Sequence, residues 1–407
     1  MRERVVIVGG GVAAVTAAKA IREINKDKEI IIYSEEKFYP YNRMRISKGM
    51  LSGIDEEKLL LEKRDWYDKN NIELNLNVNV TKIDTKEKVI NLSNGEKVNY
   101  SKLLLANGAR NFQLPIKGIN KKGVFSLRTL DDGKAILNNI AKVENILHIG
   151  GGVQGLELVS ILAKAGKKVS VMEVSSRLMP RQLDEKASII LQAAAEKAGV
   201  NVLLNTKAEE VLGEDNLTGV VTVDNTIEEC DMLIYAAGIS PNSQVVSGSN
   251  IAVNKGIVVN NKMETNIKDV YAAGDVSEFN GTVFGLWNVA TMQGKVAGIN
   301  IAGEEAYFEG VVPVTTLEAF GISLFSMGVI DEEQASYIIK EEDIEKNIYK
   351  KIIIKEDRVI GGLFLNNPRA ALPLKEAIIK NVNLSTIDYK KCSLDNFIIK
   401  LKEVNTK

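Results

Sequence analysis

Cysteine and histidine are almost missing from this sequence. Its 407 residues include two cysteines, Cys230 and Cys392, and a single histidine, His148. Two cysteines cannot form a disulfide scaffold, and so few are typical of a protein in a reducing compartment. One histidine excludes a metal site with several histidine ligands, and no C-x-x-C pair is present for an iron–sulfur cluster. We therefore expect no metal centre, and we interpret His148, which lies inside an apolar run, as a structural residue.

A long apolar run and an excess of one charge are missing too. The net charge is −1, and the 45% hydrophobic and 26% charged residues match a folded globular protein. Because no run of about 18 apolar residues is present, no segment is predicted to span a membrane. The small net charge gives no general attraction to nucleic acid or to an anionic membrane. The first apolar run begins at Val5, which leaves no room for a signal peptide, so a cytoplasmic protein is expected.

Two segments of the chain resemble copies of one structural unit. Residues 5–8 and 146–149 are short apolar runs, and each leads through glycines into a segment with the composition of a helix. Such runs are typical of buried parallel strands. A second apolar run follows each helix and ends in acidic residues, which are Glu35 and Glu36 in the first copy and Glu173 in the second. This duplication predicts an α/β fold with two Rossmann-like units.

The glycines of both copies have the spacing of a dinucleotide-binding loop. In such a loop, the strand, the tight turn and the helix N-terminus together present backbone N–H groups to a pyrophosphate. The key positions are Gly9, Gly11 and Ala14 in the first loop and Gly150, Gly152 and Gly155 in the second. The acid that binds a ribose should follow about 20 residues later, as it does in both copies. Two such sites indicate two dinucleotides, one held tightly and one exchanging.

The acids indicate which nucleotides are bound. A carboxylate at Glu173 would accept from the ribose 2′-hydroxyl of NADH and repel the 2′-phosphate of NADPH. Arg177 follows closely and could weaken this discrimination, but NADH is favoured. In the first copy either Glu35 or Glu36 could bind the ribose, and we favour Glu36.

Two later motifs identify the family that the sequence resembles. They are Ala106-Asn107-Gly108, with its counterpart Ala236-Ala237-Gly238, and the run Tyr271-Ala272-Ala273-Gly274-Asp275. With the two glycine loops they resemble the pyridine nucleotide–disulfide oxidoreductase superfamily over about residues 4–303. The resemblance implies two glutathione-reductase-like Rossmann domains, with FAD and NADH as cofactors. It also implies that Asp275 binds the ribityl chain of FAD, and that the helix entered through Trp287 and Ala290 faces the flavin.

The resemblance also divides the chain into domains. It implies an FAD-binding domain of residues 1–112 and 229–306 and an NAD-binding domain of residues 113–228. The sequence pattern changes from about Phe320 onward, which predicts a separate small α+β C-terminal domain of residues 307–407. Within the last, residues 352–360 are predicted to form a hairpin. The lysine-rich tail after Leu384 is expected to be a loosely attached helix or partly disordered.

The segment around Arg43 indicates the branch of the superfamily. Disulfide reductases carry a C-x-x-x-x-C pair here, whereas this chain has Tyr41-Asn42-Arg43-Met44-Arg45-Ile46-Ser47-Lys48. This segment resembles that of rubredoxin reductases, ferredoxin reductases and the NADH-binding part of assimilatory nitrite reductases. The resemblance implies that Arg43 contacts an FAD phosphate and that Lys48, the one candidate catalytic residue, lies near flavin N5. A solvated helix face is the alternative for Arg43, Arg45 and Lys48.

The resemblance assigns the remaining site residues by position. Arg128, with Thr129 and Asp132, is placed near the cofactor cleft, although these residues could equally cap a helix. The full FAD set is Gly9, Gly11, Ala13, Ala14, Glu35, Glu36, Arg43, Lys48, Val80, Ala106, Asn107, Gly108, Arg128, Gly274, Asp275, Trp287 and Ala290. The NADH set is Gly150, Gly152, Val153, Gln154, Gly155, Glu157, Glu173, Ala237 and Gly238.

Three functions remain compatible with these motifs. Without a thiol pair, the flavin must pass its electrons directly to an acceptor, and the resemblance to rubredoxin reductases favours a small acidic protein such as rubredoxin. The second possibility is an NADH oxidase that produces hydrogen peroxide. The third is an NADH-sensing binding protein resembling apoptosis-inducing factors, which we rank last because the chain is not basic.

Overall fold

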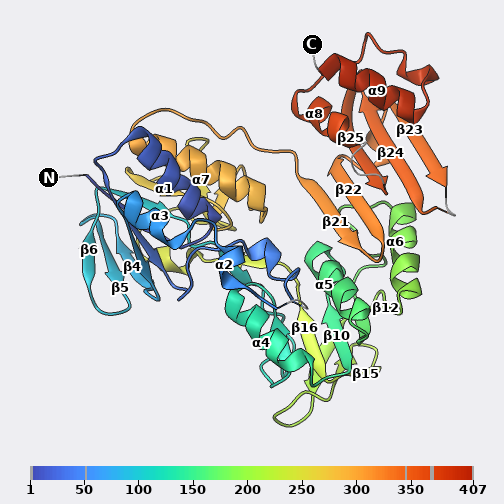
Figure 1. The fold of residues 1–407 in the computed structure, drawn as a ribbon, viewed down its shortest axis with the longest axis horizontal. Coiled ribbons are helices and arrows are strands. Elements are labelled where there is room, and N and C mark those ends of the chain that lie inside the picture. The colour runs from blue at the N-terminus through green and yellow to red at the C-terminus, as the bar shows by residue number, and fades with distance from the viewer. Residues whose placement is uncertain (1–2, 51–52, 344–345, 367–370, 406–407) are drawn as a thin grey trace. The chain divides into compact units, whose positions relative to one another are not determined.

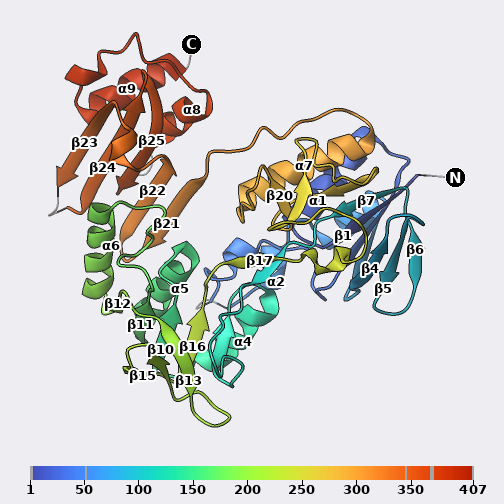
Figure 2. The same cartoon turned by 180° about the vertical axis from the view of Figure 1, so that it is seen from behind.

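The computed structural model describes residues 3–50, 53–343, 346–366 and 371–405. The chain forms two compact units (Figures 1 and 2). The first unit contains residues 1–112, 128–133 and 238–310, and the second contains residues 113–127, 134–237 and 311–407. The C-terminal segment therefore belongs to the same unit as the second glycine loop. The division into three domains stays a prediction. Residues 1–2, 51–52, 344–345, 367–370 and 406–407, which that division includes, lie outside the described part of the chain.

A five-stranded parallel sheet forms the centre of the first unit. Its strand order is β19-β7-β1-β2-β3, and its strands are β1 (Arg4–Val8), β2 (Glu29–Ser34), β3 (Ile72–Leu76), β7 (Lys102–Leu105) and β19 (Val270–Ala272). Residues 5–8, 30–33 and 103–105 of this sheet are buried. Their continuous apolar runs are typical of a parallel sheet that is covered on both faces.

Two helices lie side by side against this sheet, α1 (Val12–Ile24) and α7 (Trp287–Ala302) (Figure 1). Their backbones approach closely at two glycines of α7. A Cβ at Gly294 would lie 2.4 Å from the carbonyl oxygen of Ala13, and one at Gly298 would lie 2.5 Å from that of Ala17. The small residues of both helices therefore allow the helix that follows the first glycine loop to pack against α7.

Smaller elements surround the first sheet. A three-stranded antiparallel sheet contains β4 (Val80–Asp84), β5 (Val89–Leu92) and β6 (Lys97–Asn99). The pairs are β8 (Ala109–Asn111) with β17 (Ile239–Pro241), and β18 (Ile257–Val259) with β20 (Ser277–Phe279). The short helices are η1 (Arg43–Arg45), α2 (Glu56–Leu59), α3 (Arg64–Lys69) and η2 (Ser243–Val246).

The second unit repeats the parallel sheet. Its strand order is β12-β11-β10-β16-β9, and its strands are β9 (Val124–Ser126), β10 (Asn145–Ile149), β11 (Lys168–Met172), β12 (Asn201–Leu203) and β16 (Met232–Tyr235). The helices are α4 (Leu130–Ile140), which begins in the first unit, α5 (Val153–Lys164) and α6 (Glu185–Lys197). An antiparallel sheet of β13 (Ala208–Leu212), β14 (Gly219–Thr222) and β15 (Ile227–Glu229) completes this part. The duplicated α/β architecture is confirmed.

The C-terminal part is an antiparallel sheet covered by two helices. Its strand order is β21-β22-β25-β24-β23, and its elements are β21 (Val314–Ala319), β22 (Ile322–Gly328), η3 (Glu332–Gln334), β23 (Tyr337–Asp343), β24 (Ile348–Lys355), β25 (Arg358–Leu365), α8 (Leu372–Ile379), η5 (Tyr389–Lys391) and α9 (Leu394–Asn405). The predicted hairpin is formed by β24 and β25. The predicted α+β fold of this part is confirmed.

The tail after Leu384 is packed rather than loosely attached. On α9, Leu394, Phe397 and Leu401 are buried in the same hydrophobic core as Phe364 and Leu374. These apolar residues recur at helical spacing, so that one face of α9 is apolar although the segment is rich in lysine. The tail therefore contains a helix, as one of the two expectations had it, but the loose attachment and the partial disorder were wrong for the described residues.

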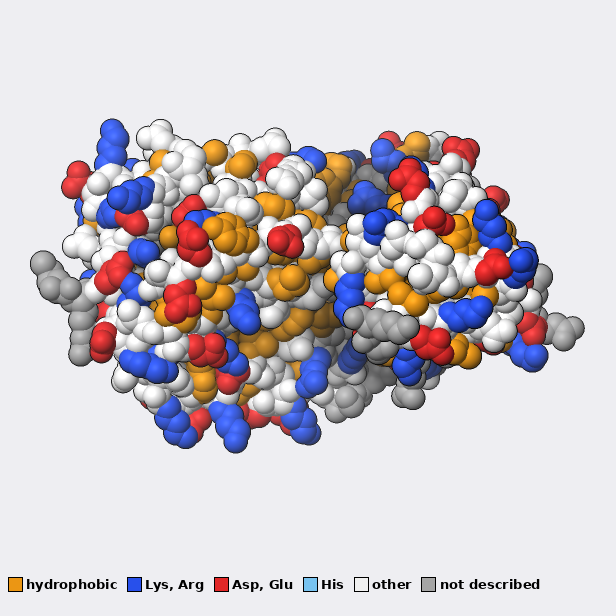
Figure 3. All heavy atoms as spheres, turned by 90° about the horizontal axis from the view of Figure 1, so that it is seen from above, with side chains coloured by type: hydrophobic (Ala, Val, Ile, Leu, Met, Phe, Trp, Pro, Cys, Tyr) orange, Lys and Arg blue, Asp and Glu red, His pale blue; other side chains and the backbone are white. Residues whose placement is uncertain are grey.

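Charges of both signs are mixed on the surface. Lys and Arg side chains are interspersed with Asp and Glu over the face drawn in Figure 3, as expected for a chain with a net charge of −1. Among the described residues, no helix has the length and apolar character needed to cross a membrane.

Candidate functional site

The first glycine loop joins β1 to α1 and has the geometry that close backbone approach requires. Gly9 has a φ of 108°, and a Cβ at this position would lie 2.3 Å from the carbonyl oxygen of Ala106. Gly11 is the N-cap of α1, has no side-chain cap, and would meet no atom within 4 Å of an added Cβ. The loop therefore leaves open space in front of a helix N-terminus, where backbone N–H groups favour an anion. Ala13 and Ala14 are buried behind it.

The acid at the end of β2 is held by two partners. The Tyr41 hydroxyl donates to Glu36 Oε2 at 2.6 Å, and Arg43 forms an ion pair with Glu36. Burial raises the pKa of Tyr41, so its hydroxyl remains a proton donor. Glu35 is exposed, which is consistent with the preference for Glu36. The role of Tyr41 was not predicted, because its contact depends on how the chain turns after β2.

Arg128 links three parts of the first unit. Its Nη2 donates to Asp275 Oδ2 at 2.7 Å, and its Nε donates to the carbonyl oxygen of Ala109 at 2.5 Å. The carbonyl oxygen of Arg128 itself accepts from Arg43 Nη1 at 3.4 Å. A chain of contacts therefore runs from Glu36 through Arg43 and Arg128 to Asp275. These four residues are far apart in the sequence, and each belongs to the predicted FAD set.

The segment after Arg128 also forms a helix cap. The Asp132 carboxylate accepts from the backbone N–H groups of Arg128, at 3.0 Å, and of Thr129, at 2.8 Å. The N–H of Asp132 donates to the Thr129 hydroxyl at 3.2 Å, so the two side chains satisfy each other's backbone groups. Thus Thr129 and Asp132 cap α4, while the Arg128 side chain remains available to Asp275. The helix-cap interpretation of this segment is confirmed, and the placement of Arg128 near a cofactor stays a prediction.

The late motif lies against the first glycine loop. Gly274 has a φ of 81°, and its added Cβ would lie 3.1 Å from the Ala13 Cβ and 3.6 Å from the Ala290 Cβ. The buried Gln293 side chain accepts from the Gly274 N–H at 2.9 Å and fixes this turn. The motif is followed in the chain by α7, which begins at Trp287 and has no side-chain cap.

A pair of asparagines in the first unit joins the Ala106-Asn107-Gly108 motif to the residue that follows β17. Asn107 Nδ2 donates to the carbonyl oxygen of Asn242 at 2.8 Å, and Asn242 Nδ2 donates to that of Asn107 at 2.9 Å. Gly108 lies beside them with a φ of 64°. In the described part of the chain, the buried Oδ1 of Asn107 has no hydrogen-bond partner. This orphaned acceptor and the open space at Gly11 fit a bound ligand in the first unit.

Two described residues of the predicted FAD set do not belong to the network of Glu36, Arg43, Arg128 and Asp275. Val80 is buried on β4, where it pairs with Leu92, and Lys48 is exposed beyond η1. Neither has a hydrogen bond or ion pair to the motifs above within the described ranges. Met44 and Arg45 on η1 are exposed as well, and 59% of Met44 is accessible to solvent.

The second glycine loop repeats the geometry of the first. Gly150 has a φ of 113°, and its added Cβ would lie 2.6 Å from the carbonyl oxygen of Ala236. Gly152 is the N-cap residue of α5, provides no capping side chain, and faces open space. A Cβ at Gly155 would lie 2.4 Å from the Gly150 carbonyl oxygen. Val153, Gln154 and Glu157 lie in the first turns of α5. Gln154 Nε2 donates to the carbonyl oxygen of Leu127 at 2.8 Å.

Glu173 is placed at the second loop by two backbone hydrogen bonds. Its Oε2 accepts from the Gly151 N–H and its Oε1 from the Ser175 N–H, both at 2.8 Å. The carboxylate is buried at the carboxyl end of β11. The Glu173 carboxylate thus lies directly beside the glycine loop, as ribose recognition requires. Ala237 and Gly238 follow β16, which pairs with β10.

His148 is buried on β10, which is consistent with the structural role that its position in an apolar run indicated. It is 1% exposed, and within the described residues neither ring nitrogen has a hydrogen-bond partner. Burial lowers its pKa to about 4, so the ring is neutral at physiological pH. Its Cε1 would lie 2.5 Å from a Cβ at Gly155, which shows that the third glycine of the loop makes room for this ring.

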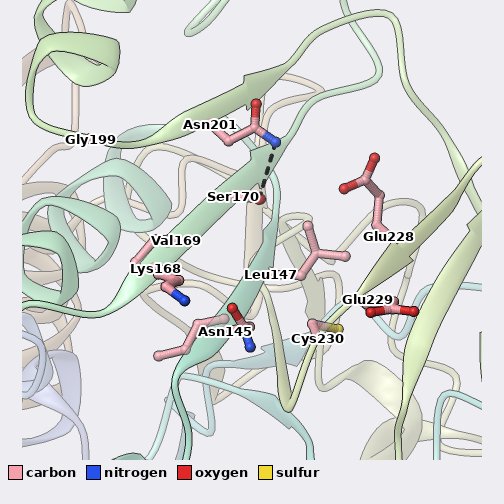
Figure 4. A pocket seen from close by; sticks show the side chains of 11 residues that line it. Asn145, Leu147, Lys168, Val169, Ser170, Gly199, Asn201, Glu228, Glu229 and Cys230 are labelled. Atoms are coloured by element: carbon pink, nitrogen blue, oxygen red, sulfur yellow. Dashed lines mark hydrogen bonds between the residues drawn. The ribbon is translucent and has the colours of Figure 1, made fainter.

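A pocket of about 140 Å³ lies at the other end of the second parallel sheet (Figure 4). Its lining includes Asn145 and Lys168, the first residues of β10 and β11, and the buried Cys230. Burial raises the pKa of the Cys230 thiol to about 12, so this cysteine is a poor nucleophile. The glycine loop follows the last residues of β10, so this pocket is separate from the predicted nucleotide site.

Known families match both parts of the chain. The family described as "Pyridine nucleotide-disulphide oxidoreductase" matches residues 3–294, which include both glycine loops. The chain belongs to this family. The description "Rubredoxin NAD+ reductase C-terminal domain" matches residues 313–382, which include the C-terminal antiparallel sheet.

Relatives within this family differ in length and in name. The chain is 31% identical to NADH-rubredoxin oxidoreductase of Clostridium acetobutylicum over 97% of this chain and 99% of that protein. It is 35% identical to nitrite reductase [NAD(P)H] of Bacillus subtilis over 94% of this chain and 48% of that protein, so it spans about half the length of that relative. It is also 33% identical to an NADH oxidase of Methanocaldococcus jannaschii, over 90% of this chain and 88% of that protein.

A solved structure has the same fold. The crystal structure of NADH:rubredoxin oxidoreductase from Clostridium acetobutylicum matches with a TM-score of 0.80 and 29% identity, and covers 98% of this chain and 100% of that chain. Membership of the family and these relatives imply FAD and NADH as the cofactors of this oxidoreductase. The geometry of the two loops fits one dinucleotide in each unit.

Proposed function

We propose that the protein oxidises NADH and passes the electrons through FAD to a small electron-transfer protein, with rubredoxin as the preferred acceptor. The observation that carries this proposal is the segment at η1. Where disulfide reductases have a cysteine pair, this chain has Arg43, Met44 and Arg45. Its two cysteines, Cys230 and Cys392, belong to the second unit, and Cys230 has a raised pKa. A thiol relay in the first unit is therefore not available.

The chain's own residues have positioning roles in this proposal. Bound FAD supplies the chemistry that accepts a hydride and releases electrons. The loop of Gly9 and Gly11 would bind its pyrophosphate, and Glu36 would bind its ribose. Arg43, Arg128 and Asp275 form the connected network that would hold the rest of the cofactor. Catalysis by such residues is mainly orientation, so no acid–base residue is required.

The second unit would bind NADH. The Gly150 to Gly155 loop presents the N-terminus of α5 to the pyrophosphate. The Glu173 carboxylate, already fixed by Gly151, would accept from the ribose 2′-hydroxyl, and its charge disfavours a 2′-phosphate. Lys48 would lie near the flavin as the resemblance implies, and its exposed position on the first unit is compatible with that role.

An acidic acceptor fits the exposed residues of the η1 region, which we call the η1 patch: Met44, Arg45 and Lys48. An exposed methionine followed by two exposed cations offers an apolar contact and a positive field. Complementary charge chiefly raises the association rate and is screened by salt. The C-terminal match to rubredoxin NAD+ reductases and the NADH-rubredoxin oxidoreductase relative support rubredoxin as the partner.

The test is a stopped-flow experiment in two stages. The FAD-loaded protein is first mixed with NADH or NADPH, and bleaching of the flavin is followed. The reduced protein is then mixed with rubredoxin at increasing salt. We expect fast reduction by NADH and a rubredoxin rate that falls steeply with salt. The proposal fails if NADH does not reduce the flavin, or if reduced protein does not reduce rubredoxin.

A charge-reversal pair makes this test specific to the η1 patch. Arg45→Glu with Lys48→Glu should slow rubredoxin reduction at low salt by tenfold or more, on the order seen for steered association. The matched control is Lys82→Glu with Lys97→Glu, which makes the same change in net charge at exposed positions of the β4-β5-β6 sheet. Equal effects of the two pairs would show that overall charge, and not the η1 patch, guides the acceptor.

A second candidate is an NADH oxidase that produces hydrogen peroxide. The NADH oxidase relative of Methanocaldococcus jannaschii favours it, and it would use the same two nucleotide sites. Turnover with oxygen and with rubredoxin, measured on one preparation, separates the two functions. A peroxide-forming rate that equals or exceeds the rubredoxin rate would favour the oxidase.

A further inference from the structure

The side chain of Asp184 connects the nucleotide-binding part of the second unit to the C-terminal sheet. Asp184 is the N-cap of α6 and accepts from the Ala187 N–H at 2.9 Å. Its Oδ2 also accepts from the Tyr349 hydroxyl at 2.7 Å and forms an ion pair with Lys351. Both partners lie on β24 of the C-terminal sheet. One carboxylate therefore serves a helix cap and an interface at the same time.

The Lys351 ammonium is buried, and its polar partners all belong to the second unit. Its side chain is 0% exposed. Besides Asp184 it contacts the carbonyl oxygen of Ile330 at 2.9 Å and Glu332 at 3.3 Å. Although burial opposes the charged form of Asp184, the bonds from Lys351, Ala187 and Tyr349 hold its pKa below the usual value. Removing one partner of a buried ion pair leaves the other charge uncompensated, which is costly.

Two further contacts attach the C-terminal sheet to the same part of the unit. The Ser326 hydroxyl on β22 donates to the carbonyl oxygen of Gln182 at 2.7 Å. The N–H of Phe320, in the turn between β21 and β22, donates to the Ser160 hydroxyl on α5 at 2.9 Å. The sheet therefore contacts both α5 and the segment that precedes α6.

That segment, residues 174–183, also touches the second glycine loop. The N–H of Met179, a residue with a φ of 49°, donates to the carbonyl oxygen of Gly151 at 3.0 Å. The Leu178 side chain lies against Gly151, because a Cβ added there would be 2.8 Å from Leu178 Cδ2. The segment begins directly after Glu173, which accepts from the Gly151 N–H. Gly151 is thus held on one side by Glu173 and on the other by Met179.

We propose that Asp184, Tyr349 and Lys351 are positioning residues for the nicotinamide dinucleotide. In this proposal the C-terminal sheet holds the 174–183 segment, and the segment holds Gly151 and Glu173 in their binding geometry. The contacts form one continuous path from β24 to the glycine loop, and such paths can carry coupling between distant sites. The inference rests on the proposed role of this loop in NADH binding. It gives the C-terminal sheet a part in nucleotide affinity besides any part in acceptor binding.

The neighbouring Lys350 provides a matched control. It lies on the same strand, is 4% exposed, and pairs with Glu341 at 3.1 Å and with Asp395 at 3.7 Å. Both of its partners belong to the C-terminal part, and side chains of adjacent residues on a strand point to opposite faces. Lys350→Met therefore removes an equally buried cation without touching Asp184.

The experiment is a calorimetric titration of the FAD-loaded full-length protein with NAD⁺. For Lys351→Met we expect the Kd to rise by about tenfold, within the usual range of coupling between sites. Lys350→Met is expected to bind NAD⁺ like the wild type. Hydrogen exchange at the Gly151 and Met179 amides should be faster in Lys351→Met and unchanged in Lys350→Met.

The outcomes separate this inference from the proposed function. If the wild type binds no NAD⁺ or NADH, the NADH-dependent function and the inference both fail. If the wild type binds and folded Lys351→Met binds equally well, or if Lys350→Met is weakened equally, only the inference is wrong. Should Lys351→Met not fold, Tyr349→Phe combined with Ser326→Ala removes two hydrogen bonds of the same interface and leaves the Lys351 cation in place. That variant must then show the weaker binding and the faster exchange, or the inference is overturned.

Discussion

The carboxylate of Glu173 accepts a hydrogen bond from the N–H of Gly151 at 2.8 Å. This bond ties the acid at the end of β11 to the middle of the second glycine loop. The second carboxylate oxygen accepts from Ser175, so the side chain is fixed before any nucleotide binds. A preorganised acceptor loses little conformational freedom when a ribose hydroxyl is presented to it.

Replacing Glu173 with alanine should weaken NADH binding and reduce discrimination against NADPH. The variant loses both the ribose acceptor and the bond to Gly151, so we expect the KM for NADH to rise about tenfold or more. The KM for NADPH should rise less, because a repulsive charge is removed too. Steady-state rates with both nucleotides measure this. Glu196→Ala, an exposed change on α6, is the control, and unchanged nucleotide preference in Glu173→Ala would contradict the assignment.

Arg128→Ala should release FAD more readily. It removes the ion pair to Asp275 and the bond to Ala109, which are both partly buried, at a cost of about 1–3 kcal/mol of stability. The flavin absorbance per protein after gel filtration should fall, and the unfolding temperature with it. Arg128→Lys keeps one contact and should be intermediate, whereas the exposed Arg110→Ala should resemble the wild type. Full FAD retention by Arg128→Ala would remove Arg128 from the site.

A cysteine-free variant should remain active. In Cys230→Ala combined with Cys392→Ser, we expect NADH oxidation with any accepted electron acceptor to stay within about twofold of the wild type, because neither thiol belongs to the first unit and Cys230 is a poor nucleophile. Turnover and thermal unfolding are measured together. A loss above tenfold in a protein that unfolds normally would mean that a thiol participates.

His148 should make the protein less stable as the pH falls from 6.5 toward 4. Burial lowers its pKa from 6.5 to about 4, so in this window the unfolded state binds a proton that the folded state does not. The contribution of the neutral histidine to the free energy of unfolding is therefore fully present above pH 6.5. It declines as the pH falls, and about 2 kcal/mol of it is lost at pH 5. Urea unfolding of wild type and His148→Leu at pH 7, 6 and 5 tests this. The variant should lack this component, and parallel curves would contradict the assignment, since His148 is the only histidine.

The sequence by itself determined the duplicated fold and the two nucleotide loops. Gly9 and Gly150 have the positive φ angles that their positions predict, because only glycine allows a turn this close to a neighbouring carbonyl group. Glu173 was found from its distance along the chain, since strand and helix lengths fix where the acid comes to lie. The missing cysteine pair was likewise visible without a structure.

Only the tertiary structure decided which distant residues meet. The network of Glu36, Arg43, Arg128 and Asp275, with Tyr41 beside it, joins segments whose pairing no local pattern encodes. The tail after Leu384 is ordered because the apolar face of α9 packs into the core of the C-terminal part. Amino-acid composition does not reveal whether such packing occurs. The contact of Asp184 with Tyr349 and Lys351 had no signal in the sequence, because this ion pair forms only when the N-terminus of α6 packs against β24, about 165 residues later in the chain. Local periodicity and spacing therefore predict elements and loops, whereas long-range polar contacts arise from how those elements pack.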